Sequence, residues 1–134
     1  MTMILYQDEW VTLSLDPAIR LVRYTRSDVP YGSLADMDHS HAGIGQALTK
    51  IPPGTKLLLD VRLAPPRNDE AFESKTNAVI EAFLRRFDGY ATLVRTAVGK
   101  LQTARLARER GSEAHAFDDE RAALESLGIG PRAT

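Results

Sequence analysis

Cysteine is absent from the 134-residue sequence. Its absence excludes disulfide bonds, a cysteine nucleophile and metal sites built from thiolates. It also fits a reducing compartment, and we expect a cytoplasmic location. The first ten residues contain two acidic side chains and lack the basic start and apolar run of a secretory signal. No run of about 18 apolar residues occurs, so we expect no membrane insertion.

An excess of charge of one sign is also missing. Seventeen basic side chains stand against eighteen acidic ones, which gives a net charge of −1. Nucleic-acid-binding proteins usually carry a basic face or tail, so nucleic acid is not an expected partner. The Gly-x-Gly segments at 43–45 and 128–130 lack a third glycine and do not join a strand to a helix, so neither predicts a nucleotide-binding loop.

Catalytic patterns are lacking as well. No serine occupies a Gly-x-Ser-x-Gly turn of the kind that presents a nucleophile. His39 and His41 stand two residues apart and point to different sides of a helix, unlike the i,i+4 pair that shares a metal ion. We expect His41 on a buried face and His39 in water. The residues therefore support no catalytic set, no metal site and no cofactor, and a non-enzymatic role is expected.

The first third of the chain predicts antiparallel strands. Residues 10–15 alternate between apolar and polar side chains, as a half-buried strand does. A turn at Asp16-Pro17 leads to a returning strand over 19–24, and residues 3–6 predict a further strand. Trp10 and Tyr31 either anchor an interface or pack in the core, and the sequence leaves both open.

Helices and strands alternate in the remainder of the chain. Apolar side chains at steps of three and four from Leu34 to Leu48 predict a helix, with Ser33 as a start signal and Pro52-Pro53-Gly54 as its stop. The other predicted elements are a buried strand (57–61), an amphipathic helix with an apolar stripe over 72–87, a strand (90–95), a helix (98–110), a strand (114–117) and a helix (118–127).

This alternation favours right-handed crossovers between parallel strands. The predicted fold class is therefore α/β, with a single mixed β-sheet that is antiparallel in its N-terminal strands and parallel in its C-terminal β-α-β-α-β part. About four helices cover it. We expect one domain over residues 1–128, followed by a short tail over 129–134.

The order of elements resembles that of STAS domains, the fold of anti-sigma-factor antagonists. Three segments are similar to the bacterial STAS/SEC14-like group: YATLVRTAVG at 90–99, LARERG at 106–111 and AFDDERAALESL at 116–127. The resemblance implies a STAS-like fold and a non-enzymatic protein-interaction module in a bacterial regulatory or signalling system.

The turn after the predicted central strand departs from the family pattern. Regulatory STAS domains carry a phosphorylatable Ser or Thr there, whereas this turn, from Arg62 to Asp69, has no hydroxyl side chain. Ser74 and Thr76 lie inside the next predicted helix, and Thr76 falls on its apolar face. The family's phosphorylation switch is therefore not expected at this turn.

The same turn is the expected binding surface. It leaves the carboxyl end of a strand, where ligand sites of open α/β sheets lie. Guanidinium groups and the N–H groups at a helix start suit carboxylates or phosphates. A structural role is the alternative, in which a loop residue caps the helix and the arginines pair with nearby acids. The candidate partner- or anion-binding residues are Arg62, Arg67, Asn68, Asp69, Arg95, Thr96 and Lys100.

Two functions from different classes remain open. In the first, a protein partner docks on the loop and the adjoining helix. In the alternative, the rim formed by the loops at the carboxyl ends of the strands binds, or acts on, a small anionic or lipid-like ligand. A closed, apolar-lined pocket beneath the rim would favour the ligand, and a flat surface would favour docking. The sequence also leaves homodimerisation open.

Overall fold

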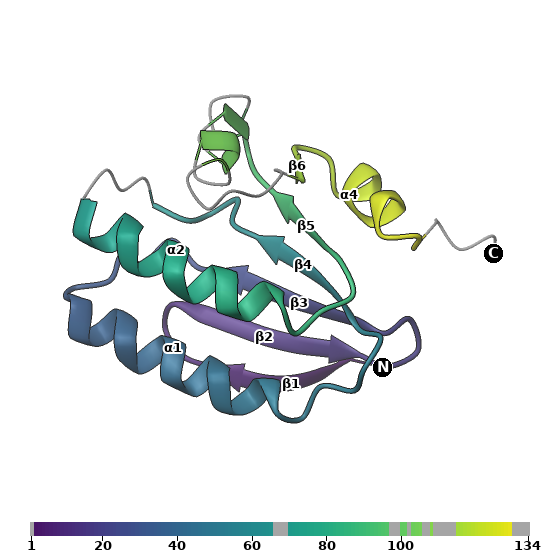
Figure 1. Cartoon of the computed structure of the whole chain (residues 1–134), viewed down its shortest axis with the longest axis horizontal. Helices are drawn as coiled ribbons and strands as arrows, with labels where there is room; N and C mark the ends of the chain where they lie inside the picture. Colours follow the sequence, from purple (N-terminus) through teal and green to yellow (C-terminus); the bar gives the residue numbers. More distant parts are fainter. Residues whose placement is uncertain are drawn as a thin grey trace.

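Six strands of the chain form one mixed sheet in the order β1-β2-β3-β4-β5-β6 (Figure 1). The structure is a computed structural model that describes residues 2–65, 70–96, 100–101, 103–105, 108 and 115–129. Its elements are β1 (Met3–Gln7), β2 (Val11–Asp16), β3 (Leu21–Arg26), α1 (Leu34–Leu48), β4 (Lys56–Asp60), α2 (Glu70–Leu84), β5 (Tyr90–Leu93), β6 (Ala116–Phe117) and α4 (Glu120–Ser126).

Strand directions change in the middle of the sheet. β1, β2 and β3 pair antiparallel, whereas β3, β4, β5 and β6 pair parallel. The predicted fold class, a mixed α/β sheet with antiparallel strands first, is therefore confirmed. Described residues between 100 and 108 are helical, in agreement with the helix predicted over 98–110.

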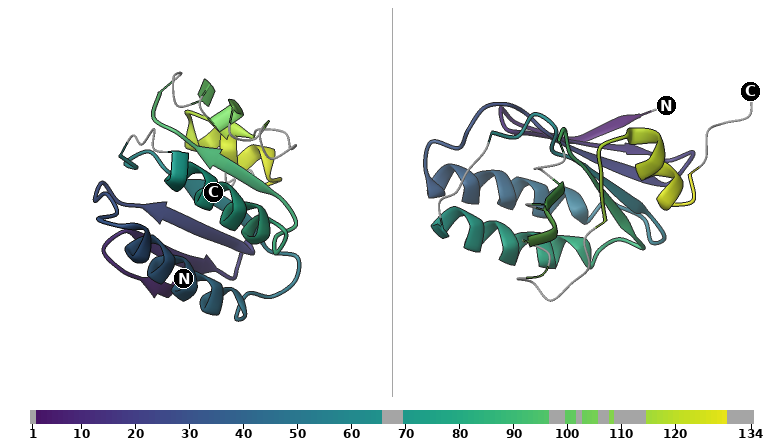
Figure 2. Two further views of the ribbon diagram at one scale, coloured as in Figure 1. Left: turned by 60° about the vertical axis from the view of Figure 1, so that its left-hand side comes forward. Right: turned by 90° about the horizontal axis from the view of Figure 1, so that it is seen from above.

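Helices cover both faces of the sheet. Each parallel strand lies beside the preceding one, and right-handed crossovers then place successive helices on the same face. Seen from above, α1 and α2 lie together on one side of the sheet (Figure 2). On the other face, Ala123 and Leu127 at α4 pack against Leu21, Leu58 and Leu93.

The largest apolar cluster lies between the sheet and the pair α1 and α2. In β2, Val11, Leu13 and Leu15 are buried in this cluster, as the alternation predicts. Trp10 and Tyr31 also belong to it, with their ring centroids 5.2 Å apart, which supports core packing over an exposed interface anchor.

Strand β3 lies two residues later than the strand predicted over 19–24. The turn extends over residues 17–20, and Arg20 adopts a left-handed backbone with φ 51°. The strand consequently extends to Arg26.

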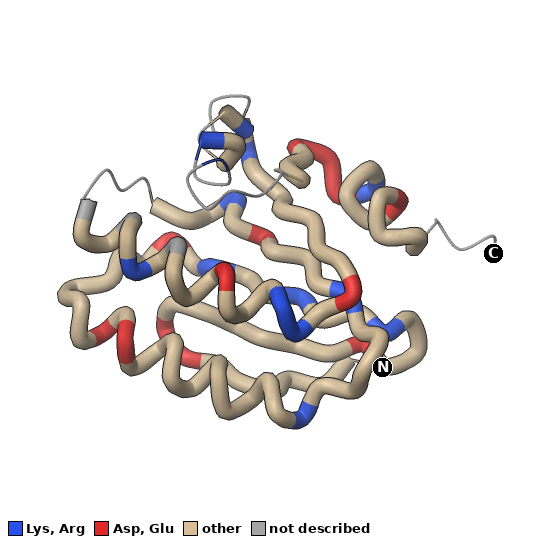
Figure 3. Tube along the Cα trace, viewed as in Figure 1, with Lys and Arg blue, Asp and Glu red and all other residues tan. Residues whose placement is uncertain are grey.

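Charges are dispersed over this fold. Basic and acidic residues are interspersed along the described elements (Figure 3). Among the described helices, none combines the length and the apolar character that a membrane span requires.

Helix α1 begins at Leu34, as the apolar spacing predicts, and ends at Leu48, ahead of the predicted stop at Pro52-Pro53-Gly54. The Ser33 hydroxyl accepts a hydrogen bond from the backbone N–H of Asp36 at 3.1 Å and so caps the first turn. Gly43, which by itself weakens a helix, allows α1 to approach the edge strand. A Cβ at this position would lie 2.2 Å from the ring of Tyr6.

The Tyr6 ring cannot easily move away. Its hydroxyl donates a hydrogen bond to Asp8 Oδ2 at 2.6 Å. Burial and the neighbouring Asp8 carboxylate raise the pKa of Tyr6 to about 12, so the hydroxyl keeps its proton and continues to donate. The contact between this ring and Gly43 therefore sets the position of α1 over β1.

A pair of glycine substitutions tests this contact. We expect Gly43→Ala to lower the free energy of unfolding by about 1–3 kcal/mol, because the new methyl group overlaps the Tyr6 ring. Gly45→Ala is the matched control, since no atom lies within 4 Å of its Cβ position, and it should stabilise the protein by up to about 1 kcal/mol. Urea unfolding measures both. Equal effects would contradict the close contact.

Candidate functional site

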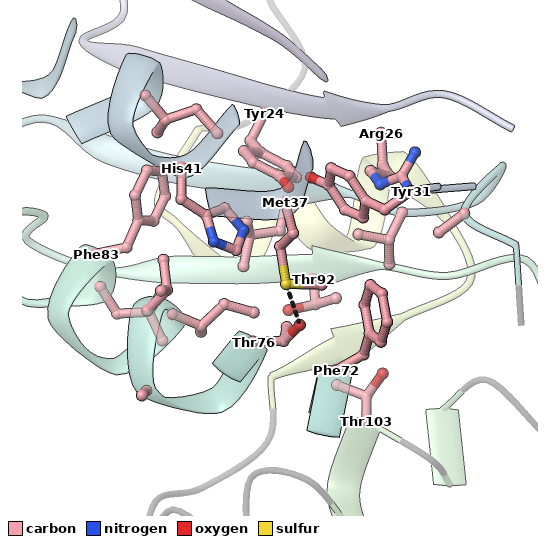
Figure 4. Close-up of a pocket in the computed structure, with 18 of the residues that line it drawn as sticks. Tyr24, Arg26, Tyr31, Met37, His41, Phe72, Thr76, Phe83, Thr92 and Thr103 are labelled. Atoms are coloured by element: carbon pink, nitrogen blue, oxygen red, sulfur yellow. Dashed lines mark hydrogen bonds between the residues drawn. The ribbon is translucent and has the colours of Figure 1, made fainter. Parts of the chain in front are cut away.

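A cavity of about 1050 Å³ lies between the sheet and helices α1 and α2 (Figure 4). Its floor is formed by β3, β4 and β5, and its walls by the two helices. The volume lies just above the range of small-molecule sites, roughly 300–1,000 Å³.

The cavity is open to solvent on the helix side. Four small residues that line it are exposed, two on α1 and two on α2: Ala42, Gly45, Ala78 and Ala82. Larger apolar residues of α1, α2 and β4 surround the cavity instead of filling it. They are Met37, Ile44, Leu48, Leu59, Phe72, Val79, Ile80, Phe83 and Leu84. The result is a predominantly apolar interior.

One end of the cavity lies at the carboxyl ends of three parallel strands. Because β3, β4 and β5 run in the same direction, their carboxyl ends meet at one edge, where ligands of open α/β sheets bind. Arg26 ends β3, Arg62 follows β4, and Arg95 and Thr96 follow β5, and all four line the cavity. We call this edge the strand-end rim.

The structure places some of the candidate residues predicted from the sequence at the strand-end rim and others elsewhere. Arg62, Arg95 and Thr96 come together there. Lys100 is exposed and is not among the described residues that line the cavity. Arg67, Asn68 and Asp69 lie outside the described residues.

The two hydroxyl side chains of α2 lie in different surroundings. Ser74 is exposed, whereas Thr76 lines the cavity with its Oγ1 3.9 Å from Met37 Sδ (Figure 4). Thr76 therefore lies on the apolar face of α2, as its spacing in the sequence predicts.

Arg62 is engaged by acidic residues on the α4 side of the sheet. Its Nε and Nη2 donate to the two carboxylate oxygens of Asp60 at 3.0 and 2.8 Å, and Nη2 lies 3.5 Å from Glu120. Arg23 Nη1 adds contacts of 3.7 Å to Asp60 and 3.1 Å to Glu120. Two arginines and two carboxylates thus neutralise one another, which is the structural role that the sequence left open for Arg62.

Asp60 is the buried centre of this four-residue cluster, with 6% of its surface exposed. Burial by itself would raise the pKa of its carboxyl group. Hydrogen bonds from the Arg62 side chain and backbone, together with the charges of Arg62 and Arg23, outweigh burial and hold that pKa below its usual 3.8. The carboxylate is therefore ionised at neutral pH.

Replacing the buried carboxylate tests its contribution. Asp60→Asn retains the shape but turns an amide donor towards the two arginines, so we expect a loss of about 1–3 kcal/mol in unfolding free energy at pH 7. Glu120→Gln is the control, since that side chain is 40% exposed and should cost less than about 1 kcal/mol. Chemical denaturation measures both. If Asp60→Asn costs no more than Glu120→Gln, the central role of Asp60 is wrong.

Arg26 is a site residue that the sequence reasoning missed. The strand predicted over 19–24 ends two residues before it. Had the strand been extended by one more period of two, Arg26 would have fallen on the same face as Val22 and Tyr24. Only 7% of Arg26 is exposed, and it lies next to Tyr31 at one end of the cavity (Figure 4).

His41 also lines the cavity, from α1. Its ring stands edge to face with Tyr31, with centroids 6.2 Å apart, and its Nδ1 has no hydrogen-bond partner among the described residues. Burial, helped by the positive charges of Lys75 and Arg26, lowers the pKa of His41 below its usual 6.5, against the opposing charges of Asp38 and Asp8. The imidazole is therefore neutral at pH 7.

The lowered pKa of His41 makes stability depend on pH. As pH falls through about 6.5, the unfolded chain takes up a proton before the folded one, so the free energy of unfolding decreases from there downwards. One proton sets an upper limit of about 1.4 kcal/mol per pH unit. His41→Gln should flatten the curve between pH 7.5 and 5, and His39→Gln, an exposed control, should not. An unchanged curve in His41→Gln would refute the assignment.

The far end of the cavity, where α1 and α2 end, holds a different arginine. Arg86 Nη2 donates to the backbone oxygen of Leu48 at 3.1 Å. On the α1 wall, the Asp38 carboxylate is paired with Lys75 Nζ at 2.8 and 2.9 Å. Asp38 is thus neutralised by Lys75, whereas Arg86 bonds only a backbone carbonyl oxygen but is exposed, so solvent screens its charge.

Fold and site together define a class: an open mixed α/β sheet with a ligand-sized apolar cavity under one helical layer. Comparisons with protein-family models, with curated proteins and with solved structures found no match. The resemblance to STAS domains therefore stays a prediction.

Proposed function

We propose that this protein binds an elongated, largely apolar small molecule in the cavity between the sheet and helices α1 and α2. The observation that carries the proposal is the cavity itself, with its volume of about 1050 Å³ and its apolar lining beneath the strand-end rim. Of the two functions left open by the sequence, an apolar hollow beneath the rim favours the lipid-like ligand over docking on a flat surface, although the hollow is open to solvent on the helix side.

The shape of the cavity supports a chain-like ligand. Lining residues run along α2 from Phe72 to Leu84, a rise of about 18 Å at 1.5 Å per residue. An extended apolar chain laid along this direction would contact aliphatic and aromatic side chains over its length. Burying such a chain contributes about 0.8 kcal/mol for each CH₂ group.

Protein docking at the rim stays a prediction, as do the cytoplasmic location and the bacterial signalling role that the STAS resemblance implies. The docking hypothesis assigns the Arg62 guanidinium to a partner. That guanidinium is already bound to Asp60 and Glu120. No observation here favours docking over ligand binding.

Filling the cavity tests the proposal. Thr92 is buried on β5 and lines the cavity, so Thr92→Phe places an aromatic ring in the ligand space. Thr12→Phe makes the same change on β2, where Thr12 alternates with Val11 and Leu13 and so points to the other face of the sheet. We expect the wild type to bind Nile red, and Thr92→Phe to weaken binding roughly tenfold, equivalent to about 1.4 kcal/mol.

Fluorescence titration measures the dye affinity, and circular dichroism verifies that both variants are folded. Thr12→Phe should bind the dye as the wild type does. A wild type that takes up no apolar probe, or equal dye affinities in the two folded variants, would rule out the cavity as the binding site.

A further inference from the structure

We infer that the cavity ligand is a single-chain amphiphile with an anionic head group, a carboxylate or a phosphate, and that Arg26 binds this head group at the strand-end rim. The inference rests on the proposed function, since it names the chemistry of the ligand in the same cavity. It is carried by the position, the burial and the unpaired charge of Arg26.

Strand alternation directs Arg26 towards the cavity. Val22, Tyr24 and Arg26 stand at every second position of β3 and so share one face. Val22 packs in the cluster beneath α1 and α2, and both Tyr24 and Arg26 line the cavity. The guanidinium is therefore a buried cation at the end of an apolar space.

The charge of Arg26 has no counter-charge in the described part of the chain. Its Nη1 donates to three backbone oxygens, those of Trp10 at 3.3 Å, Ser27 at 2.9 Å and Val29 at 2.8 Å. No carboxylate among the described residues pairs with it, and Nε and Nη2 have no acceptor there. A guanidinium offers five N–H donors, so those that remain can serve a bidentate anion.

Burying an uncompensated cation is costly, and a ligand anion would remove that cost. The same contacts hold the guanidinium ready for this role. The carbonyl bonds fix Nη1, and the Tyr31 ring lies 4.5 Å from Cζ, which orients the guanidinium plane by a cation–π contact.

The other charged groups of the cavity define the orientation of the ligand. Asp38 is paired with Lys75, and Arg62 with Asp60. Of the other lining arginines, Arg95 at the strand-end rim and Arg86 at the far end are both exposed to solvent, whereas Arg26 is buried. The head group lies at Arg26, and the chain extends between α1 and α2 towards the far end of the cavity.

Three probes with the same alkyl chain test this inference: dodecanoic acid, dodecyl phosphate and dodecanol. Affinities are measured at pH 8 by isothermal titration calorimetry or by displacement of Nile red. We expect the wild type to bind at least one of the two anions about 10- to 100-fold more tightly than dodecanol, as a charge-assisted hydrogen bond pair predicts.

Arginine variants locate the head group. Arg26→Gln should remove the preference for the anion while leaving dodecanol affinity within about threefold of wild type. Arg26→Lys retains the charge without the planar fork and should keep part of the preference. Arg86→Gln is the matched control, because that arginine lines the opposite end of the same cavity, and it should leave the preference unchanged.

The outcomes separate this inference from the proposed function. Equal affinity of the wild type for the anions and for dodecanol overturns the inference and needs no variant. The inference is also overturned if Arg26→Gln retains the preference for the anion, or if Arg86→Gln loses it. In each of these cases dodecanol still binds and the apolar-ligand function stands. If neither dodecanol nor Nile red binds the wild type, the proposed function itself fails.

Discussion

Backbone hydrogen bonds between the parallel strands β3, β4 and β5 direct all three carboxyl ends to one edge of the sheet. The rest of the molecule depends on this pairing. Because each strand lies next to its predecessor, the right-handed crossovers place α1 and α2 on the same face. The space between those helices and the sheet therefore ends at the edge where side chains from three separate segments of the chain meet.

The two faces of the sheet differ in whether a buried charge has a counter-charge among the described residues. On the α4 face, Asp60 at the end of β4 is buried but satisfied by Arg62 and Arg23. On the cavity face, Arg26 at the end of the adjacent strand is equally buried and contacts only carbonyl oxygens and an aromatic ring among the described residues. The first arrangement is complete within the chain, whereas we propose that an anion from outside completes the second.

Local patterns were sufficient for most of the fold. The periodicity from Leu34 to Leu48 and the alternation of β2 predicted these elements, because burial on one face imposes a fixed spacing on apolar residues. The end of β3 was missed, since nothing in the local sequence shows that the turn extends through Arg20 with φ 51°. Because of that shift of two residues, the predicted strand did not include Arg26, the buried arginine of the site.

The sequence by itself determined the class of fold, the rim at the strand ends and the absence of thiol chemistry, because these follow from composition and from short-range spacing. Only the tertiary structure decided that Arg62 is paired with Asp60 while Arg26 is not, and that the apolar stripes of α1 and α2 surround a cavity. Both depend on distances between segments far apart in the chain, and neither residue type nor periodicity specifies how much space two helices leave between them.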